Sequence, residues 1–274
     1  MVTVNTNKGA MAAIQDLRVV GQSMAKSQAA IATGSKISTV QGSASSWVLA
    51  KHTSSDVSAY NRVRESIDRA SAMLDTAMAA GEAIMDLLDQ MKSKALAGTQ
   101  TNNSAAVQAA PSADYISLRQ QIGLVVANAQ FDGSNMLGPS PSSASALGDV
   151  DGNNSITIAG ADLSYGTAVM QITFFSHLSA PNNASTALGL VNGTITTLGN
   201  QMATWAAGAK RLETHRDLTT KIQMALDTSF ASLNDADLST ESAKLKAAQT
   251  REQLATQAFS VANATTRSAL SLFP

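Results

Sequence analysis

Two long segments at the ends of this chain repeat apolar residues at alternating spacings of three and four, and a middle stretch rich in Gly, Ser and Asn separates them. That alternation is the period of a helix that buries one narrow stripe against a partner helix. Because each end needs a partner for its stripe, we predict a mainly α fold. It is a long helical hairpin or coiled-coil bundle that brings the N- and C-termini together, with a small insert rich in β-hairpins.

The composition argues against several classes of protein. The formal net charge is -1 and cysteine is absent. A near-neutral balance predicts no nucleic-acid partner, and the lack of cysteine excludes disulfides, thiolate catalysis and Cys-ligated metals. No apolar run reaches the ~18 residues of a membrane-spanning helix, so we predict no membrane insertion. The first residues lack the basic and apolar regions of a cleaved signal peptide, so we expect export without one.

Periodicity in the first half predicts three helices. The first covers 8–33 and ends at Gly34, because glycine is common just after a helix. The second keeps the alternating spacing from Tyr60 to Ala95. The third begins with Pro111 in its first turn and runs to about residue 129.

Periodicity returns in the second half, at about 188–233 and again at about 239–272. We expect the helix at about 188–233 to pack against the second helix along a long apolar seam. The last helix carries two adjacent apolar stripes, a face too wide for one partner helix to cover. We therefore expect assembly with further chains to order it. The predicted seam consists of Ile67, Leu74, Ile84, Leu88, Leu198, Met202 and Trp205.

The middle of the chain predicts strands instead of helices. Turn-forming residues recur between 131 and 181, and short alternating runs lie at 156–158 and 169–174. We expect one or two β-hairpins there.

No set of residues predicts catalysis or metal binding. The three histidines, His52, His177 and His215, have no ligand spacing among them. Residues 149–153 resemble a calcium loop only in part and are better interpreted as an Asp-Gly turn. We find no nucleophile elbow and no phosphate-binding loop. We therefore predict a protein that is not an enzyme and has no cofactor.

Two segments resemble bacterial flagellin, the subunit of the flagellar filament. Ile31-Ala32-Thr33-Gly34-Ser35-Lys36-Ile37 is similar to the turn that follows the first helix of that family. The run from Gln249 to Asn263, with the ending Leu270-Ser271-Leu272-Phe273, is similar to the family's closing helix. The short middle and Trp47 resemble the compact flagellins of α-proteobacteria.

The resemblance implies a layered subunit. Residues 1–40 and 235–274 form an inner terminal coiled-coil domain, 45–135 and 185–232 an outer helical domain, and 136–184 a β-rich surface insert. It also implies an extracellular helical homopolymer for swimming motility. The implied partners are copies of the chain, sister flagellins, hook-associated and cap proteins, an export chaperone and the flagellar type III export apparatus.

Polymerisation is the mechanism that this interpretation predicts. On the first and last helices we expect the polymerisation interface to consist of Ile14, Leu17, Met24, Ile31, Leu254, Ala258, Phe259, Val261 and Leu272. Two alternatives stay open at this point. One is the hook–filament junction protein, which shares both terminal motifs but does not polymerise by itself, and the other is an enzyme built on a helical scaffold.

Overall fold

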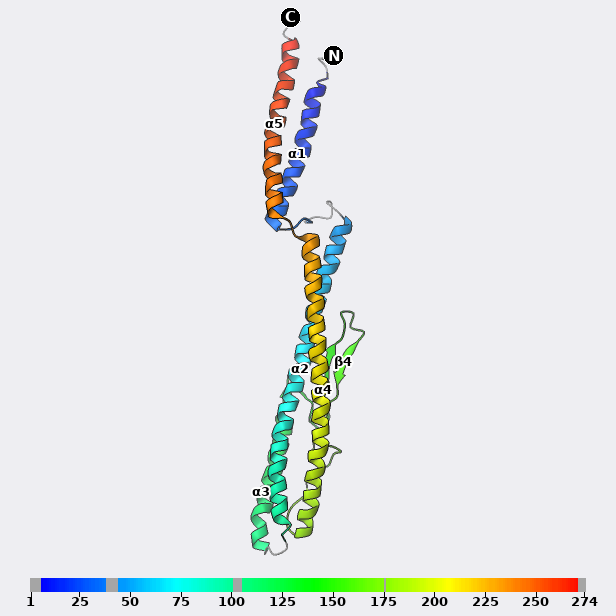
Figure 1. The fold of residues 1–274 in the computed structure, drawn as a ribbon, viewed down its shortest axis with the longest axis vertical. Helices are drawn as coiled ribbons and strands as arrows, with labels where there is room; N and C mark the ends of the chain where they lie inside the picture. Colours follow the sequence, from blue (N-terminus) through cyan, green and yellow to red (C-terminus); the bar gives the residue numbers. More distant parts are fainter. Residues whose placement is uncertain (1–5, 38–43, 101–104, 175, 271–274) are drawn as a thin grey trace. The chain divides into compact units, whose positions relative to one another are not determined.

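A computed structural model describes residues 6–37, 44–100, 105–174 and 176–270 (Figure 1). In these ranges the helices are α1 (Lys8–Thr33), α2 (Ala44–Gly98), α3 (Ala105–Asn128), α4 (Pro181–Asn234) and α5 (Leu238–Leu270). The strands are β1 (Gln130–Phe131), β2 (Ser134–Asn135), β3 (Ala144–Leu147) and β4 (Ser155–Ile158). The mainly α fold with a small β insert is therefore confirmed.

Contacts divide the chain into two compact units. The terminal unit comprises residues 1–57 and 224–274, and the central unit comprises residues 58–223. Both units contain one part from the first half of the sequence and one from the second, as expected of a helical hairpin.

In the terminal unit, α1 and α5 pair in antiparallel directions. The Asn7 side-chain amide donates to the Ala262 carbonyl over 3.0 Å at one end of the pair, and the Ser27 hydroxyl donates to Glu241 over 2.9 Å near the other. A Cβ added at Gly9 would lie 3.4 Å from the Ala262 Cβ, so the two backbones approach closely there. The beginning of α1 therefore lies beside the end of α5 (Figure 1).

Local sequence sets both ends of α1. Asn7 caps its N-terminus by accepting a hydrogen bond from the Ala10 amide over 2.9 Å. Gly34 ends it in the left-handed region, at a φ of 67°, which glycine adopts without steric cost. The segments after α1 and before α5 are then bonded to each other. Ala236 N–H donates to the Gly34 carbonyl over 2.9 Å, and the Ser35 hydroxyl donates to Asn234 Oδ1 over 2.6 Å.

The central unit packs α2, α3 and α4 side by side around an apolar core (Figure 1). Asp68 pairs with Arg216 at 2.7 Å, and Gly81 faces Met202 further along, which shows that α2 and α4 are antiparallel. A salt bridge of 2.7 Å between Lys94 and Asp114 joins α2 to α3. The largest fully buried side chains are Trp205, Tyr115, Ile67, Leu74, Ile84, Leu88, Met91, Ile122, Met136, Leu137, Leu163 and Met170.

Both β-hairpins belong to the central unit. β1 and β2 pair across the turn Asp132-Gly133, where both residues have positive φ, as a type I′ hairpin turn requires. β3 and β4 pair antiparallel over four residues each. The second hairpin is attached to α4, because the Trp205 indole N–H donates to the Ala159 carbonyl over 3.0 Å.

The strand expected at 169–174 is wrong. Met170 and Ile172 are buried, as the alternation predicted, but the segment has no strand structure. Part of its backbone bonds to α4 instead: Gln171 N–H donates to the Thr194 hydroxyl over 3.1 Å, and the Thr197 hydroxyl donates to the Val169 carbonyl over 2.7 Å. The Met170 and Ile172 carbonyls accept from Gly166 N–H in the preceding loop. Side-chain hydroxyls of a helix thus satisfy groups that a partner strand would otherwise bond.

Two predicted helix starts lie too far along the sequence. α3 begins at Ala105, so Pro111 lies inside the helix and not in its first turn. The Ala-rich residues before Pro111 favour helix strongly enough to extend it backwards. α2 likewise begins at Ala44, sixteen residues before the periodic stripe that predicted it.

Threonine side chains bond back to their own helices. On α4, the hydroxyls of Thr186, Thr196, Thr204, Thr214, Thr220 and Thr228 each donate to the carbonyl four residues earlier. Thr250 and Thr256 do the same on α5. The O–H donors of these threonines are therefore bonded within their own helices.

Candidate functional site

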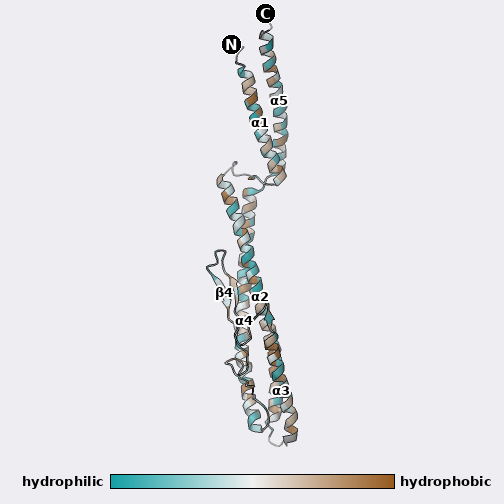
Figure 2. Ribbon diagram, turned by 180° about the vertical axis from the view of Figure 1, so that it is seen from behind, coloured by the Kyte–Doolittle hydropathy of each residue, from teal (hydrophilic) through white to brown (hydrophobic). Residues whose placement is uncertain are grey.

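The α1–α5 pair carries the residues predicted to mediate polymerisation. On α5, the stripe of Ala255, Phe259 and Ala262 is half-buried. Ala248, which lies on the same stripe nearer the beginning of the helix, is buried. The adjacent stripe points into solvent, where Leu254 is 58% exposed and Val261 63% exposed. Along both helices of this pair, brown hydrophobic residues alternate with teal hydrophilic ones in Figure 2. One predicted stripe thus packs on α1, and the other is uncovered.

On α1 the predicted stripe is only partly the packed one. Leu17, Met24 and Ile31 are half-buried, whereas Ile14 is 39% exposed. The buried positions are Ala10, Ala13, Ser27 and Ala30, which the sequence interpretation missed because it followed bulky residues. Small residues at spacings of three and four could have revealed this face.

A groove opens between the two helices on the uncovered side. It has a volume of about 440 Å³ and is lined by Asp16, Val19, Val20, Arg251, Leu254, Ala255 and Ala258. Apolar side chains line most of it, with one acidic residue from α1 and one basic residue from α5. A ridge of apolar side chains with a charged group suits such a groove. Leu272, also predicted for the interface, lies outside the described residues.

Hydrogen bonds hold the beginning of α5 in place. The Glu241 carboxylate accepts from Lys244 Nζ over 2.7 Å and from the buried Ser27 hydroxyl. These bonds, the one from Lys244 foremost, lower the pKa of Glu241. The carboxylate therefore stays charged and links α5 to α1 at neutral pH.

The predicted seam residues of the central unit lie together along α2 and α4. Met202 is half-buried and contacts Gly81, where a side chain would displace its sulfur. The fully buried members are Ile67, Leu74, Ile84, Leu88, Leu198 and Trp205.

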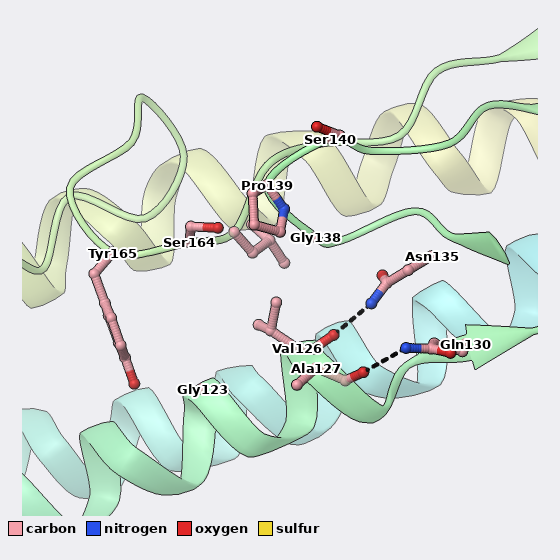
Figure 3. A pocket seen from close by; sticks show the side chains of 11 residues that line it. Gly123, Val126, Ala127, Gln130, Asn135, Gly138, Pro139, Ser140, Ser164 and Tyr165 are labelled. Atoms are coloured by element: carbon pink, nitrogen blue, oxygen red, sulfur yellow. Dashed lines mark hydrogen bonds between the residues drawn. The ribbon is translucent and has the colours of Figure 1, made fainter. Parts of the chain in front are cut away.

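A pocket of about 550 Å³ lies in the central unit between α3 and the loops that follow β2 and precede α4 (Figure 3). The Asn135 side-chain amide donates to the Val126 carbonyl, and that of Gln130 donates to the Ala127 carbonyl. The Tyr165 hydroxyl, over Gly123, donates to the Arg119 carbonyl. Its polar side chains thus mostly serve the backbone, and no carboxylate, histidine or cation lines it.

A buried cation lies near the Tyr165 ring. Arg119 is 6% exposed, and its guanidinium carbon lies 4.9 Å from the centre of the Phe174 ring and 6.0 Å from that of Tyr165. One of its nitrogens donates to the Ser176 carbonyl over 2.9 Å. Aromatic faces stabilise a cation in this arrangement. Arg119 thereby links α3 to the segment before α4.

The described residues include no group of three or more His, Asp or Glu side chains placed to hold a metal ion. In the same ranges, none of the helices combines the length and the apolar character that crossing a membrane requires.

Both ends of the chain match a known family. The bacterial flagellin N-terminal helical region matches residues 4–140, and the bacterial flagellin C-terminal helical region matches residues 188–273. Flagellin FljK of Caulobacter vibrioides is 36% identical over 99% of this chain and 98% of its own length. A flagellin of Brucella melitensis is 30% identical over 100% of this chain and 99% of its own.

A solved structure has a similar fold. The crystal structure of Bacillus cereus flagellin matches with a TM-score of 0.50 and 20% identity, over 56% of this chain and 88% of that chain. Nothing in these comparisons favours the hook–filament junction alternative. Because the sequence matches extend over both helical regions and over whole relatives, the chain belongs to the bacterial flagellin family and is a structural subunit of the flagellar filament.

Proposed function

We propose that this flagellin polymerises through the uncovered faces of α1 and α5. The observation that carries the proposal is the second stripe of α5, where Leu254 and Val261 are 58% and 63% exposed beside an apolar groove. Exposed apolar residues in one continuous face are typical of an interaction surface. Burial of that face against neighbouring copies supplies free energy that the isolated pair lacks.

The proposal assigns a role to each part of the chain. Residues 1–40 and 235–274 form the inner coiled coil of the filament, 45–135 and 185–232 its outer helical layer, and 136–184 a surface insert. Family membership supports this division. It also supports export without a cleaved signal through the flagellar type III apparatus, with an export chaperone, and assembly with hook-associated and cap proteins.

Leu254→Asp tests the proposed interface. An unpaired carboxylate buried between subunits costs several kcal/mol. A cost of about 3 kcal/mol raises the critical concentration for assembly on the order of a hundredfold. We expect monomers with a wild-type circular dichroism spectrum, measured by seeded polymerisation and negative-stain electron microscopy.

Ser260→Asp is the matched control. Ser260 is exposed on the same helix, about 120° around its axis from Leu254. It receives the same charge outside the apolar stripe, so we expect filaments from this variant. Normal filaments from the Leu254 variant would refute the proposed interface.

A further inference from the structure

The central unit has an uneven distribution of charge along its length. Residues 58–73 of α2 lie level with residues 210–223 of α4, because Asp68 pairs with Arg216 and the Gln223 amide donates to Asn61 over 2.9 Å. These two segments, the basic half, hold seven basic and four acidic residues. Residues 74–98 hold four acidic and two basic residues, and residues 184–209 of α4, which lie level with them, hold no charged residue.

The acidic residues of α2 form one stripe. Asp75, Glu82, Asp86 and Asp89 are separated by seven, four and three residues, so they share a face of the helix. All four are exposed, and among the described residues none of them forms a salt bridge. Lys92, the next charged residue along α2, lies to one side of this stripe, which therefore keeps an excess of negative charge.

A groove in the basic half presents the opposite charge. It has a volume of about 490 Å³ and is lined by Ile156, Ala207, Lys210, Arg211, Thr214, His215 and Leu218. Its apolar part is open to solvent, since Leu218 is 51% exposed. Arg211 is exposed and has no salt bridge within the described part of the chain, whereas Lys210 pairs with Glu213 at 2.7 Å.

We propose that the acidic stripe of one copy docks on the basic groove of the next copy. The two surfaces are complementary in charge and belong to different parts of one central unit. Pairing of either surface with itself would bring like charges together, which is destabilising. A contact between two different surfaces leaves one of each free on the end copies, so it extends from copy to copy as a filament requires when the rotation between copies does not close a ring.

This inference rests on the assembly of the chain with copies of itself, and it adds a contact distinct from that of α1 and α5. Exposed charges at an interface mainly set association rate and register. The contact therefore governs how fast and in which orientation a subunit joins. Salt weakens it, because the Debye length falls from about 10 Å at 0.1 M to about 3 Å at 1 M ionic strength.

Charge reversal tests the contact in the full chain. One variant carries Glu82→Lys, Asp86→Lys and Asp89→Lys, and a second carries Lys210→Glu and Arg211→Glu. A third combines all five changes, which exchanges the charges of the two surfaces. A fourth, Glu82→Gln with Asp86→Asn and Asp89→Asn, removes charge without reversing it. Circular dichroism checks that each variant folds, and seeded elongation is measured with each variant's own subunits at low and high salt.

We expect the first two variants to elongate at least about tenfold more slowly than wild type at low salt, in the range by which electrostatic steering changes association. The neutral variant should lie between them and wild type, and high salt should narrow the differences. The variant with all five substitutions should recover most of the wild-type elongation rate. Two results would refute this contact without refuting the assembly proposal: charge-reversed variants that elongate like wild type, or a variant with all five substitutions that elongates as slowly as the first two. A wild-type chain that forms no filaments would overturn the assembly proposal and this contact with it.

Discussion

Gly208 of α4 offers a quantitative test of how the second hairpin is attached. A Cβ added at Gly208 would lie 2.8 Å from Cδ1 and 2.9 Å from Cγ1 of Ile158, which is itself buried. Gly199, on the same helix, has nothing within 4 Å of the same position. The two glycines therefore share a helix but differ in the space available for a methyl group.

The expected magnitudes follow from two opposing effects. Replacing a glycine inside a helix by alanine stabilises it by about 1 kcal/mol. Overpacking a filled site costs about 1–3 kcal/mol. Gly199→Ala should therefore stabilise the central unit by up to about 1 kcal/mol. Gly208→Ala should be about 1–3 kcal/mol less stable than Gly199→Ala, because only the second effect distinguishes them.

Urea unfolding of the monomer, followed by Trp205 fluorescence in a Trp47→Phe background, measures this difference. With a slope of about 2 kcal/mol per M, the two midpoints should differ by roughly 0.5–1.5 M. In an Ile158→Ala background the contact is gone, so Gly208→Ala should stabilise the unit there as Gly199→Ala does. Equal stabilisation by both alanines in the wild-type background would refute the packing that the structure shows.

Two further predictions concern Tyr115 and Gly34. Burial raises the pKa of Tyr115 to about 12, although the nearby Arg119 charge opposes the shift, so folding favours the neutral phenol. The contribution of this group to the free energy of unfolding is fully present below about pH 10, and about 2–3 kcal/mol of it is lost as the pH rises through 12. Because the buried hydroxyl of Tyr115 has no hydrogen-bond partner among the described residues, Tyr115→Phe should change stability at pH 7 by less than about 1 kcal/mol. When urea midpoints are measured at increasing pH, the Phe variant should lose less stability than wild type above about pH 10. An equal alkaline loss in both proteins would contradict this. Gly34→Ala should destabilise the terminal unit by about 1 kcal/mol, because the φ of 67° at this position is strained for alanine, and Gly34→Asn should destabilise it by less. Thermal melts monitored by circular dichroism measure both effects. An alanine variant as stable as wild type would be incompatible with the left-handed cap.

Sequence patterns predicted the helices well where bulky residues marked the stripe or a glycine marked the end. The bounds of α1 agree with the prediction because Gly34 closes the helix where the stripe stops. The beginning of α2 was missed, because residues 44–59 become helical without a continuous apolar stripe. A pattern of bulky residues carries no signal for such a segment.

The candidate interface could be predicted only in part, for a related reason. Which of two adjacent stripes on α5 packs against α1 depends on the shape of α1, whose buried positions are mostly alanines. Periodicity counts an alanine as weakly apolar, although small size is what allows helices to approach closely. The segment 169–174 shows a similar limit, since Gln171 N–H and the Val169 carbonyl bond to threonine hydroxyls on a helix more than 20 residues away.

The threonines of α4 and α5 that bond to their own helices reduce the hydration of these helix surfaces. A hydroxyl that donates to a carbonyl of its own helix does not need water to accept its proton, so covering it with a second molecule costs less than covering a hydroxyl whose donor is bonded to water. Hydropathy scales therefore overstate how strongly these helices hold water. A filament subunit with few bulky residues gains contact area in this way at a lower desolvation cost.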